Sequence, residues 1–386
     1  MASRGIMIDQ CHLQYKERVN LGSYYTKPEL VSLVYHLIRK NVRDYQEHIL
    51  LDTSCGYGSF LQEKRWNNKR IGADIDESAL EEAASISPDV FFIHKNALNN
   101  VSREHYQLSA GDKIIIVGNP PYNDTSSIIR NNIKQSFEDI EPSLKTRDLG
   151  MSFLLSYNRL FADYICVLHP LSYLIKKANF TLIKPLADKY TLIDSVIISS
   201  GEFTQTSKIT AFPIIIALYK RDQLGMDYKF ITNYLFRTKE GKTFRLSDFD
   251  SISNYLTKYP NQKYVNPKDV VAKFWTMRDI NALKRSRTFV TETTTNTIFV
   301  TKKLFDYYCY VDIFKRFISR IPYYFGNCDV MINNEDFLKI KDDFKIFSLK
   351  CHPYLRSDIH LNYGAQFSMD KIEEYFLKLL GEHYVY

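Results

Sequence analysis

Short apolar runs that alternate with helical segments are the feature that most constrains the fold of this 386-residue chain. Four runs cover residues 48–51, 70–73, 90–93 and 113–118, and the last is apolar throughout its centre, as a strand buried on both faces requires. Apolar residues recur at helical spacing over residues 28–42. Strand, loop and helix therefore follow one another as in βαβ units, which predicts an α/β fold with an open parallel sheet.

The alternation continues further along the chain and then stops. Residues 164–168 form a fifth apolar run, and residues 193–198 and 211–219 form two more that a polar turn joins. Antiparallel pairing is the simplest connection across that turn. The expected sheet is therefore mostly parallel with an antiparallel strand. We place a domain boundary where the alternation ends, which gives domains of residues 1–224 and 225–386.

The tetrapeptide Asn119-Pro120-Pro121-Tyr122 directly follows the fourth run. Ligands of open α/β sheets bind outside the carboxyl ends of the strands, so we expect this segment at the rim of an active site. The Asn119 amide oxygen and the Pro120 carbonyl can accept the two hydrogens of an amino group, and Tyr122 offers a face on which a base can stack. Two such acceptors direct the amino lone pair towards an electrophile such as a sulfonium methyl group, in a reaction governed by positioning. The alternative is a plain turn, since Asn and Pro are common turn residues.

A glycine-containing loop follows the first run, with the sequence DTSCGYGSF from Asp52 to Phe60, and a helix is expected to start over Ser59 to Lys64. Gly56 and Gly58 allow the backbone to approach a ligand closely, although the third glycine of a dinucleotide-binding loop is missing. Asp74 ends the second run, where a carboxylate can bind ribose hydroxyls while Ile75 packs on an adenine ring. Helix capping is the alternative role for Asp74.

In this order, these motifs resemble those of the amino-directed, S-adenosylmethionine-dependent DNA adenine methyltransferases, in particular the gamma-class modification enzymes of type II restriction systems. The resemblance covers residues 20–220. It implies a Rossmann-like methyltransferase sheet, followed by a C-terminal α+β target-recognition domain. It also implies S-adenosylmethionine as the cofactor.

The resemblance implies roles for individual residues. Two positions depart from the family, because Asn96 stands where an Asp usually meets the adenine amino group and Thr53 stands where Pro is frequent. The implied catalytic residues are Asn119, Pro120, Pro121 and Tyr122. The implied cofactor-binding residues are Tyr25, Thr26, Asp52, Ser54, Cys55, Gly56, Gly58, Asp74, Ile75, Asn96, Ala97 and Asn119. By the same resemblance Phe203 stacks with Tyr122 on a flipped-out adenine, the alternative being a core or surface aromatic.

The second domain is basic. Lys and Arg minus Asp and Glu give 26 − 25 = +1 for residues 1–224 and 25 − 19 = +6 for residues 225–386. Basic residues that lie next to aromatic ones predict contacts with nucleic-acid phosphates. The residues expected to bind DNA are Lys284, Arg285, Arg287, Lys315 and Arg316. A structural or oligomerisation domain with a solvated basic face is the alternative.

Several other classes of protein are disfavoured. The six cysteines form no Cys-x-x-Cys pair and the histidines are scattered, so we expect no disulfide framework and no metal site. No run of apolar residues is long enough for a membrane span, which predicts a cytoplasmic protein that associates with the nucleoid when bound to DNA. None of the 12 prolines precedes a cysteine, which argues against cytosine-ring methylation through a Pro-Cys nucleophile.

The sequence therefore predicts an adenine-specific DNA methyltransferase that acts on double-stranded DNA. Such an enzyme protects host DNA from a cognate restriction endonuclease without needing a stable complex with it. We expect a monomer, with a dimer as the alternative. Protein glutamine and RNA adenine methyltransferases use the same or a related motif and remain alternatives, as does a nucleic-acid-binding module without catalysis.

Overall fold

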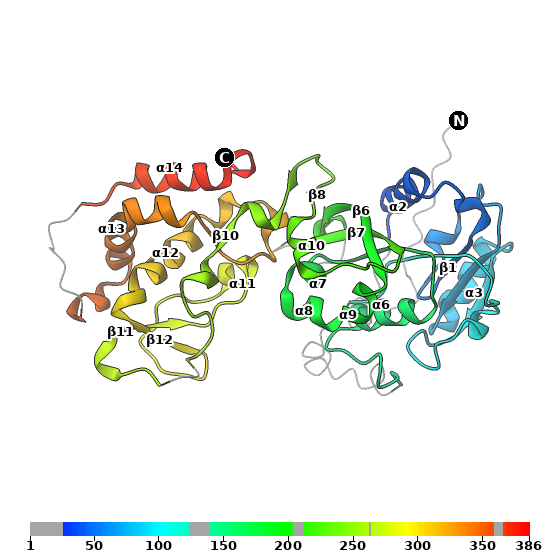
Figure 1. The fold of residues 1–386 in the computed structure, drawn as a ribbon, viewed down its shortest axis with the longest axis horizontal. Coiled ribbons are helices and arrows are strands. Elements are labelled where there is room, and N and C mark those ends of the chain that lie inside the picture. Colours follow the sequence, from blue (N-terminus) through cyan, green and yellow to red (C-terminus); the bar gives the residue numbers. More distant parts are fainter. Residues whose placement is uncertain (1–25, 123–138, 204–210, 262–263, 359–365) are drawn as a thin grey trace. The chain divides into compact units, whose positions relative to one another are not determined.

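The computed structural model describes residues 26–122, 139–203, 211–261, 264–358 and 366–386. The chain divides into two units (Figure 1), the first made of residues 1–209 and 214–241 and the second of residues 210–213 and 242–386.

A seven-stranded sheet forms the centre of the first unit, with the strand order β3-β2-β1-β4-β5-β7-β6. Strands β1 to β5 pair in parallel, and β7 runs antiparallel to β5. The α/β fold with a mostly parallel sheet and an antiparallel strand is thereby confirmed. The strands are β1 Ile49–Asp52, β2 Arg70–Asp74, β3 Phe91–His94, β4 Ile114–Gly118, β5 Tyr164–Pro170, β6 Tyr190–Ser199 and β7 Pro213–Arg221.

The helices of the first unit pack on this sheet by their apolar faces. Pro28 begins α2, which contacts β5 and β6 and buries Leu30, Val34 and Leu37 completely. Helix α3 contacts β2 and β3, and its N-cap Asp76 accepts a hydrogen bond from the Ala79 amide. The helices are α2 Pro28–Asn41, α3 Glu77–Ile86, α6 Leu149–Arg159, α7 Ser172–Ile175, α8 Lys177–Leu182, α9 Lys184–Ala187 and α10 Tyr228–Asn233.

One expected helix is absent from the described residues. The sequence predicts a helix that starts at Ser59, but only a 3-10 turn forms there, over Ser59–Leu61. The Phe60 carbonyl, which would have served the next helical turn, instead accepts a hydrogen bond from the buried Tyr35 hydroxyl. The prediction was wrong because this tertiary contact outweighs local helical preference.

The first unit extends further along the chain than the boundary at 224/225 that the sequence suggested. Helix α10 contacts α7, and the short strand β8 (Phe236–Arg237) contacts β6. The Lys239 amide also donates to the Ile197 carbonyl of β6 at 2.8 Å. These contacts place the division after Gly241.

The second unit combines helices with short antiparallel strand pairs, and aromatic rings fill its core. Strands β11 and β12 pair in antiparallel register, as do β10 and β13. Tyr310 of α12 is fully buried, with ring centroids 5.1 Å from Phe337 and 5.3 Å from Phe344. The elements are β9 Thr243–Phe244, β10 Asp250–Ser251, β11 Val270–Trp275, α11 Ile280–Arg285, β12 Thr297–Thr301, α12 Phe305–Arg316, β13 Met331–Ile332, α13 Asn334–Cys351 and α14 Met369–Leu380.

Candidate active site

The predicted motifs meet at one edge of the sheet. Strand β1 ends at Asp52, β2 at Asp74 and β4 at Gly118, and β1 pairs in parallel with both β2 and β4. Parallel neighbours present their carboxyl ends at the same edge, where open α/β sheets bind ligands. The glycine loop, the acidic residue after β2 and the tetrapeptide after β4 are therefore neighbours in space.

The loop after β1 is tied to Asp74. Gly56 and Gly58 have left-handed φ values of 48° and 73°, which glycine adopts without strain. The Gly56 amide donates to Asp74 Oδ2 at 2.8 Å, and the Asp76 amide donates to Asp74 Oδ1 at 3.0 Å. Burial raises the pKa of Asp74. Beside it the apolar Ile75 side chain is 63% exposed, so a flat apolar ligand can lie against it.

Asp52 lies under this loop and packs against the end of β4. It is buried, and its Oδ1 accepts a hydrogen bond from the Ser54 amide at 3.1 Å. Burial raises the pKa of Asp52 to about 8, and the charge of Asp74 adds to this shift. A methyl group on Gly118, whose φ is 149°, would lie 2.8 Å from Asp52 Oδ1. Glycine at 118 therefore allows β4 to approach this carboxyl group.

The substitution Asp52→Asn is expected to remove a pH dependence of stability. The folded chain keeps the Asp52 proton up to about pH 8, whereas the unfolded chain releases it near pH 3.8. The contribution of Asp52 to the free energy of unfolding is therefore most favourable below about pH 4, and it is lost as the pH rises towards 8. Urea unfolding between pH 5 and 7 should show wild-type stability falling faster than that of Asp52→Asn, by up to about 1.4 kcal/mol per pH unit. Parallel pH profiles would contradict the raised pKa.

The Asn119 side chain is held at both ends of its amide group. Its Nδ2 donates to Thr26 Oγ1 at 3.2 Å, and its Oδ1 accepts from the Tyr122 hydroxyl at 2.8 Å. Thr26 is buried, whereas Asn119 and Tyr122 are half-buried. Pro120 is buried and Pro121 half-buried. An amide oxygen has two acceptor positions, so one remains for an incoming amino group.

The start of helix α6 lies against the tetrapeptide, which the sequence analysis missed. A methyl group on Gly150 would lie 3.3 Å from Tyr122 Cβ and 2.6 Å from the Tyr173 hydroxyl. Tyr173 donates a hydrogen bond to Asp148, the N-cap residue of α6. Asp148 and Gly150 carry an ordinary helix-start signal, which cannot reveal from sequence alone that the helix begins beside Tyr122.

Among the other residues predicted to bind the cofactor, Tyr25 lies outside the described residues. The Cys55 thiol is buried, which raises its pKa. Asn96 Oδ1 accepts from the Leu98 amide at 2.9 Å, and the Ala97 carbonyl accepts from the buried Ser156 hydroxyl of α6 at 2.7 Å. The segment after β3 is therefore anchored on α6.

A cluster of buried hydroxyl groups lies beneath the glycine loop. The Tyr157 hydroxyl of α6 lies close to those of Thr53 and Ser54. Within the described residues none of these three hydroxyls has a hydrogen-bond partner. Buried polar groups without partners are uncommon and suggest a position where a ligand or water completes the network.

Phe203 is only 3% exposed and ends the short turn η4 (Ser200–Glu202) after β6. The neighbouring Glu202 forms ion pairs with Lys239 at 2.7 Å and with Lys27 at 3.9 Å. Lys27 follows Thr26, so this turn lies near the Asn119 site. The ring must leave its buried position if it is to stack on a base.

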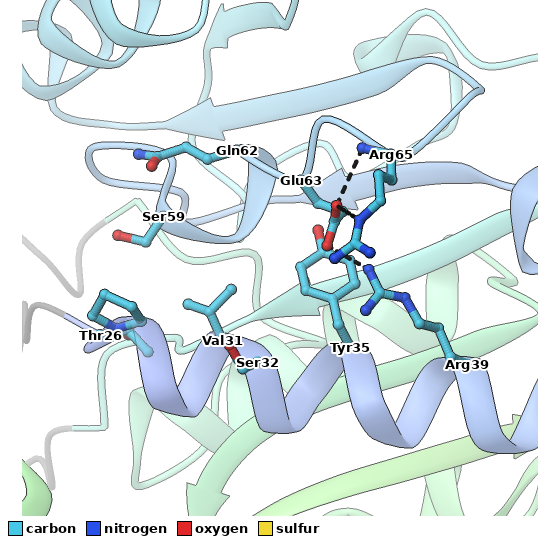
Figure 2. A pocket seen from close by; sticks show the side chains of 10 residues that line it. Thr26, Val31, Ser32, Tyr35, Arg39, Ser59, Gln62, Glu63 and Arg65 are labelled. Carbon is cyan, nitrogen blue, oxygen red and sulfur yellow. Dashed lines mark hydrogen bonds and ion pairs between the residues drawn. The ribbon is translucent and has the colours of Figure 1, made fainter. Parts of the chain in front are cut away.

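A pocket of about 290 Å³ lies between α2 and the segment that follows the glycine loop (Figure 2). At one end are Thr26 and Ser59, and at the other the Glu63 carboxylate pairs with Arg39 and Arg65. Its lining includes Thr26 but not Asp74, Ile75, Asn96 or Asn119. It therefore borders the predicted cofactor site without coinciding with it.

The predicted DNA-binding residues of the second unit come together at the ends of two helices. Lys284 and Arg285 lie in the last turn of α11, and Lys315 of α12 donates to the Ser286 carbonyl that follows α11, at 2.5 Å. Arg287 lies over the Trp275 ring, 4.4 Å from its centroid, and Arg316 lies over Phe347 at 5.5 Å. The hydrogen bond from Lys315 to Ser286 thus joins two basic clusters, although Lys315 also serves as a helix cap. The first cluster is Lys284, Arg285 and Arg287, and the second is Lys315 and Arg316.

The described part of the chain shows neither a metal-binding cluster nor a membrane-spanning helix. No group of three or more His, Cys, Asp or Glu side chains is arranged to hold a metal ion there. Of the helices in the same residues, none has the length and hydrophobicity needed to cross a membrane.

Comparison with solved structures finds remote similarity to many chains, including the following three. One is the methyltransferase subunit of the type I restriction-modification system from Streptococcus thermophilus, at 14% identity and TM-score 0.41, covering 83% of this chain and 57% of that one. Another is an rRNA methylase from Streptococcus thermophilus, at 12% identity and TM-score 0.30, with 52% and 99% covered. The third is the N-methyltransferase NodS from Bradyrhizobium japonicum WM9, solved with S-adenosyl-L-homocysteine, at 12% identity and TM-score 0.30, with 49% and 86% covered.

All three are methyltransferases. No protein-family model matches the chain, and no curated protein matches it. Likeness this remote carries no argument about substrate, and the fold class rests on the strand order and pairing described above.

Proposed function

We propose that the protein is an S-adenosylmethionine-dependent methyltransferase that methylates the exocyclic amino nitrogen of adenine in double-stranded DNA. The observation that carries this proposal is the Asn119 amide, held between Thr26 and Tyr122 at the carboxyl end of β4 and next to the glycine loop. The second unit, with its joined basic clusters, is the proposed target-recognition domain.

The residues around the loop fit S-adenosylmethionine. A side chain at Gly56 would meet nothing within 4 Å, so a ligand has room against the backbone there. The Asp74 carboxylate is suited to ribose hydroxyls, the exposed Ile75 to the adenine ring, and the Asn96 oxygen to the adenine amino group. When bound, the cofactor supplies a sulfonium methyl group as the electrophile.

The chain's own residues position the target amino group. Asn119 Oδ1 and the Pro120 carbonyl accept its two hydrogens, which leaves the nitrogen lone pair directed towards the methyl group. Thr26 holds the amide by its Nδ2 group, so that Oδ1 keeps its orientation. Tyr122 stacks on the flipped base and thereby offsets part of the cost of unstacking it. Phe203 is the proposed second stacking residue.

Substitutions of Tyr122 should separate its ring from its hydroxyl. Tyr122→Phe keeps the stacking face and frees the second lone pair of Asn119 Oδ1, so we expect kcat/KM within about fivefold of wild type, because an ordinary hydrogen bond contributes about 1 kcal/mol. Tyr122→Ala loses the stacking of about 1–3 kcal/mol, and we expect kcat/KM to fall about 5- to 150-fold. Steady-state kinetics on methylatable DNA measures both. Equal losses in the two variants would show that the hydroxyl, and not the ring, is needed.

Expression in a host that lacks DNA methylation tests the whole proposal. Mapping of modified adenines should reveal methylation confined to one short sequence motif. A genome without modified adenine, together with transfer of methyl groups to RNA or to a protein glutamine, would refute the DNA assignment. Resistance of the same DNA to a restriction endonuclease would then test the proposed protective role.

A further inference from the structure

A tryptophan lies on the outward face of the β11–β12 strand pair in the second unit. Along β11 the side chains of Ala272 and Phe274 are buried, whereas Lys273 and Trp275 alternate with them and are half-buried. Phe274 packs on Tyr308 of α12, with ring centroids 5.0 Å apart. Because successive side chains of a strand point to opposite faces, Trp275 points away from this core.

Arg287 lies over one face of the Trp275 ring. Its guanidinium lies 4.4 Å from the Trp275 ring centroid, and one of its nitrogens lies 3.3 Å from the Glu292 carboxylate. The Trp275 amide donates to the Thr288 carbonyl at 2.8 Å, which fixes the segment of Arg287 alongside β11. Within the described residues no aromatic ring packs on Trp275, whereas the rings of the core pack on one another.

The surroundings of this pair carry a positive charge. Lys284 and Arg285 are exposed, and within the described residues neither forms an ion pair. Lys273 donates to the Thr291 carbonyl at 3.1 Å and Lys315 to the Ser286 carbonyl at 2.5 Å, and within the described residues neither forms an ion pair. Glu292 is the acidic residue that contacts Arg287. The segments that pack around Trp275 therefore carry several basic side chains, while Glu292 pairs with Arg287.

We infer that Trp275 and Arg287 form a contact point for DNA on the second unit, in which the ring packs on a base or sugar and the guanidinium binds a phosphate. The inference rests on the proposed function, which makes DNA the substrate, and names the surface of the second unit that holds it. Tryptophan and arginine contribute most of the binding energy at many interfaces. Because the Arg287 guanidinium already lies over the Trp275 ring, the two side chains need little rearrangement to bind DNA. The surrounding positive charge attracts a polyanion, and a two-stranded ribbon is of a size that a DNA major groove can accept.

Intrinsic fluorescence gives a direct test, because the chain has only two tryptophans. The other, Trp66, is 4% exposed in the first unit, and its indole N–H donates to the His48 carbonyl at 2.9 Å. A short DNA duplex of mixed sequence, added at low salt to the full-length protein, should quench the emission. Trp66→Phe should keep this quenching and Trp275→Phe should lose it. Quenching that survives in Trp275→Phe would overturn the inference.

Binding measurements provide an independent readout. We expect Trp275→Ala to weaken duplex binding about tenfold, since stacking on an aromatic residue contributes strongly to nucleic-acid affinity. Arg287→Ala should weaken binding and lower the slope of log affinity against log salt by about 0.9, as the loss of one phosphate contact requires. The matched control is Lys339→Ala, because Lys339 is paired with Glu335 and Asp336 and should leave affinity and slope unchanged.

The outcomes separate this inference from the proposed function. A wild-type protein that binds no DNA would refute the proposed function and the inference together. A protein that binds and methylates DNA while Trp275→Ala and Arg287→Ala retain full affinity would refute only the contact point. Thermal unfolding of each variant establishes that weakened binding does not come from loss of the fold.

Discussion

Replacement of Asn119 by alanine is expected to lower kcat for methyl transfer by about a thousandfold, the loss typical when a group that stabilises the transition state is removed. The alanine side chain cannot accept a hydrogen bond from the target amino group, so the lone pair of the amino nitrogen is no longer directed towards the methyl donor. Binding of S-adenosylmethionine should remain largely intact, because its proposed contacts also include the glycine loop and Asp74. Calorimetry with the cofactor and single-turnover kinetics with DNA measure the two effects separately.

Asn99→Ala is the matched control for this experiment. Asn99 is an exposed asparagine in the loop after β3 and has no proposed contact with substrate or cofactor. It should leave kcat unchanged. An Asn119→Ala variant with wild-type turnover would rule out the mechanism even if the protein proved to be a methyltransferase. Loss of cofactor binding together with turnover would instead indicate collapse of the site.

Gly118→Ala should both destabilise the first unit and abolish activity. The backbone φ of 149° is strained for any residue with a side chain, and the new methyl group would lie 2.8 Å from Asp52 Oδ1. Together the strain and the overpacking should lower the free energy of unfolding by about 2–5 kcal/mol. The residue that follows is Asn119, so any shift of the backbone also displaces the amide that we propose to be catalytic.

Gly111→Ala provides the comparison for this substitution. An added methyl group at Gly111 would meet nothing within 4 Å, so its effect on the free energy of unfolding should stay within about 0.5 kcal/mol. Urea unfolding of the two variants and of wild type decides the matter. If Gly118→Ala unfolded at the same urea concentration as Gly111→Ala, the close packing of β4 against Asp52 would be disproved.

The central strands β1 and β4 of the first unit were readable from the sequence because they are buried on both faces. A run such as Ile114 to Val117 has no polar residue, and such runs occur in few contexts other than a central parallel strand. The ends of these strands then indicated which polar residues would be neighbours. The order of the motifs along the chain thereby predicted that Asp52, Asp74 and Asn119 would lie at one edge.

Other parts depend on contacts between distant residues and could not be predicted in this way. The helix expected from Ser59 is missing because Tyr35, on another element, takes the Phe60 carbonyl. The extension of the first unit to Gly241 depends on pairing with Ile197, which no local pattern signals. The support that Thr26 gives to Asn119 joins residues 93 positions apart. The hydrophobic pattern and the secondary-structure propensities of a sequence describe single helices and strands, whereas these contacts arise when distant elements pack together.

The strand order of the sheet has a consequence for how the chain is synthesised. Strand β7 lies between β5 and β6 although it is made after both, and β6 is the edge strand beside it. While the ribosome is still producing residues before Pro213, β5 therefore presents an unpaired edge and β6 has no neighbour within the sheet. Exposed strand edges invite pairing with other chains. A fragment that ends at Ser199 should consequently aggregate, and production of the first unit alone requires the chain to continue through Arg221.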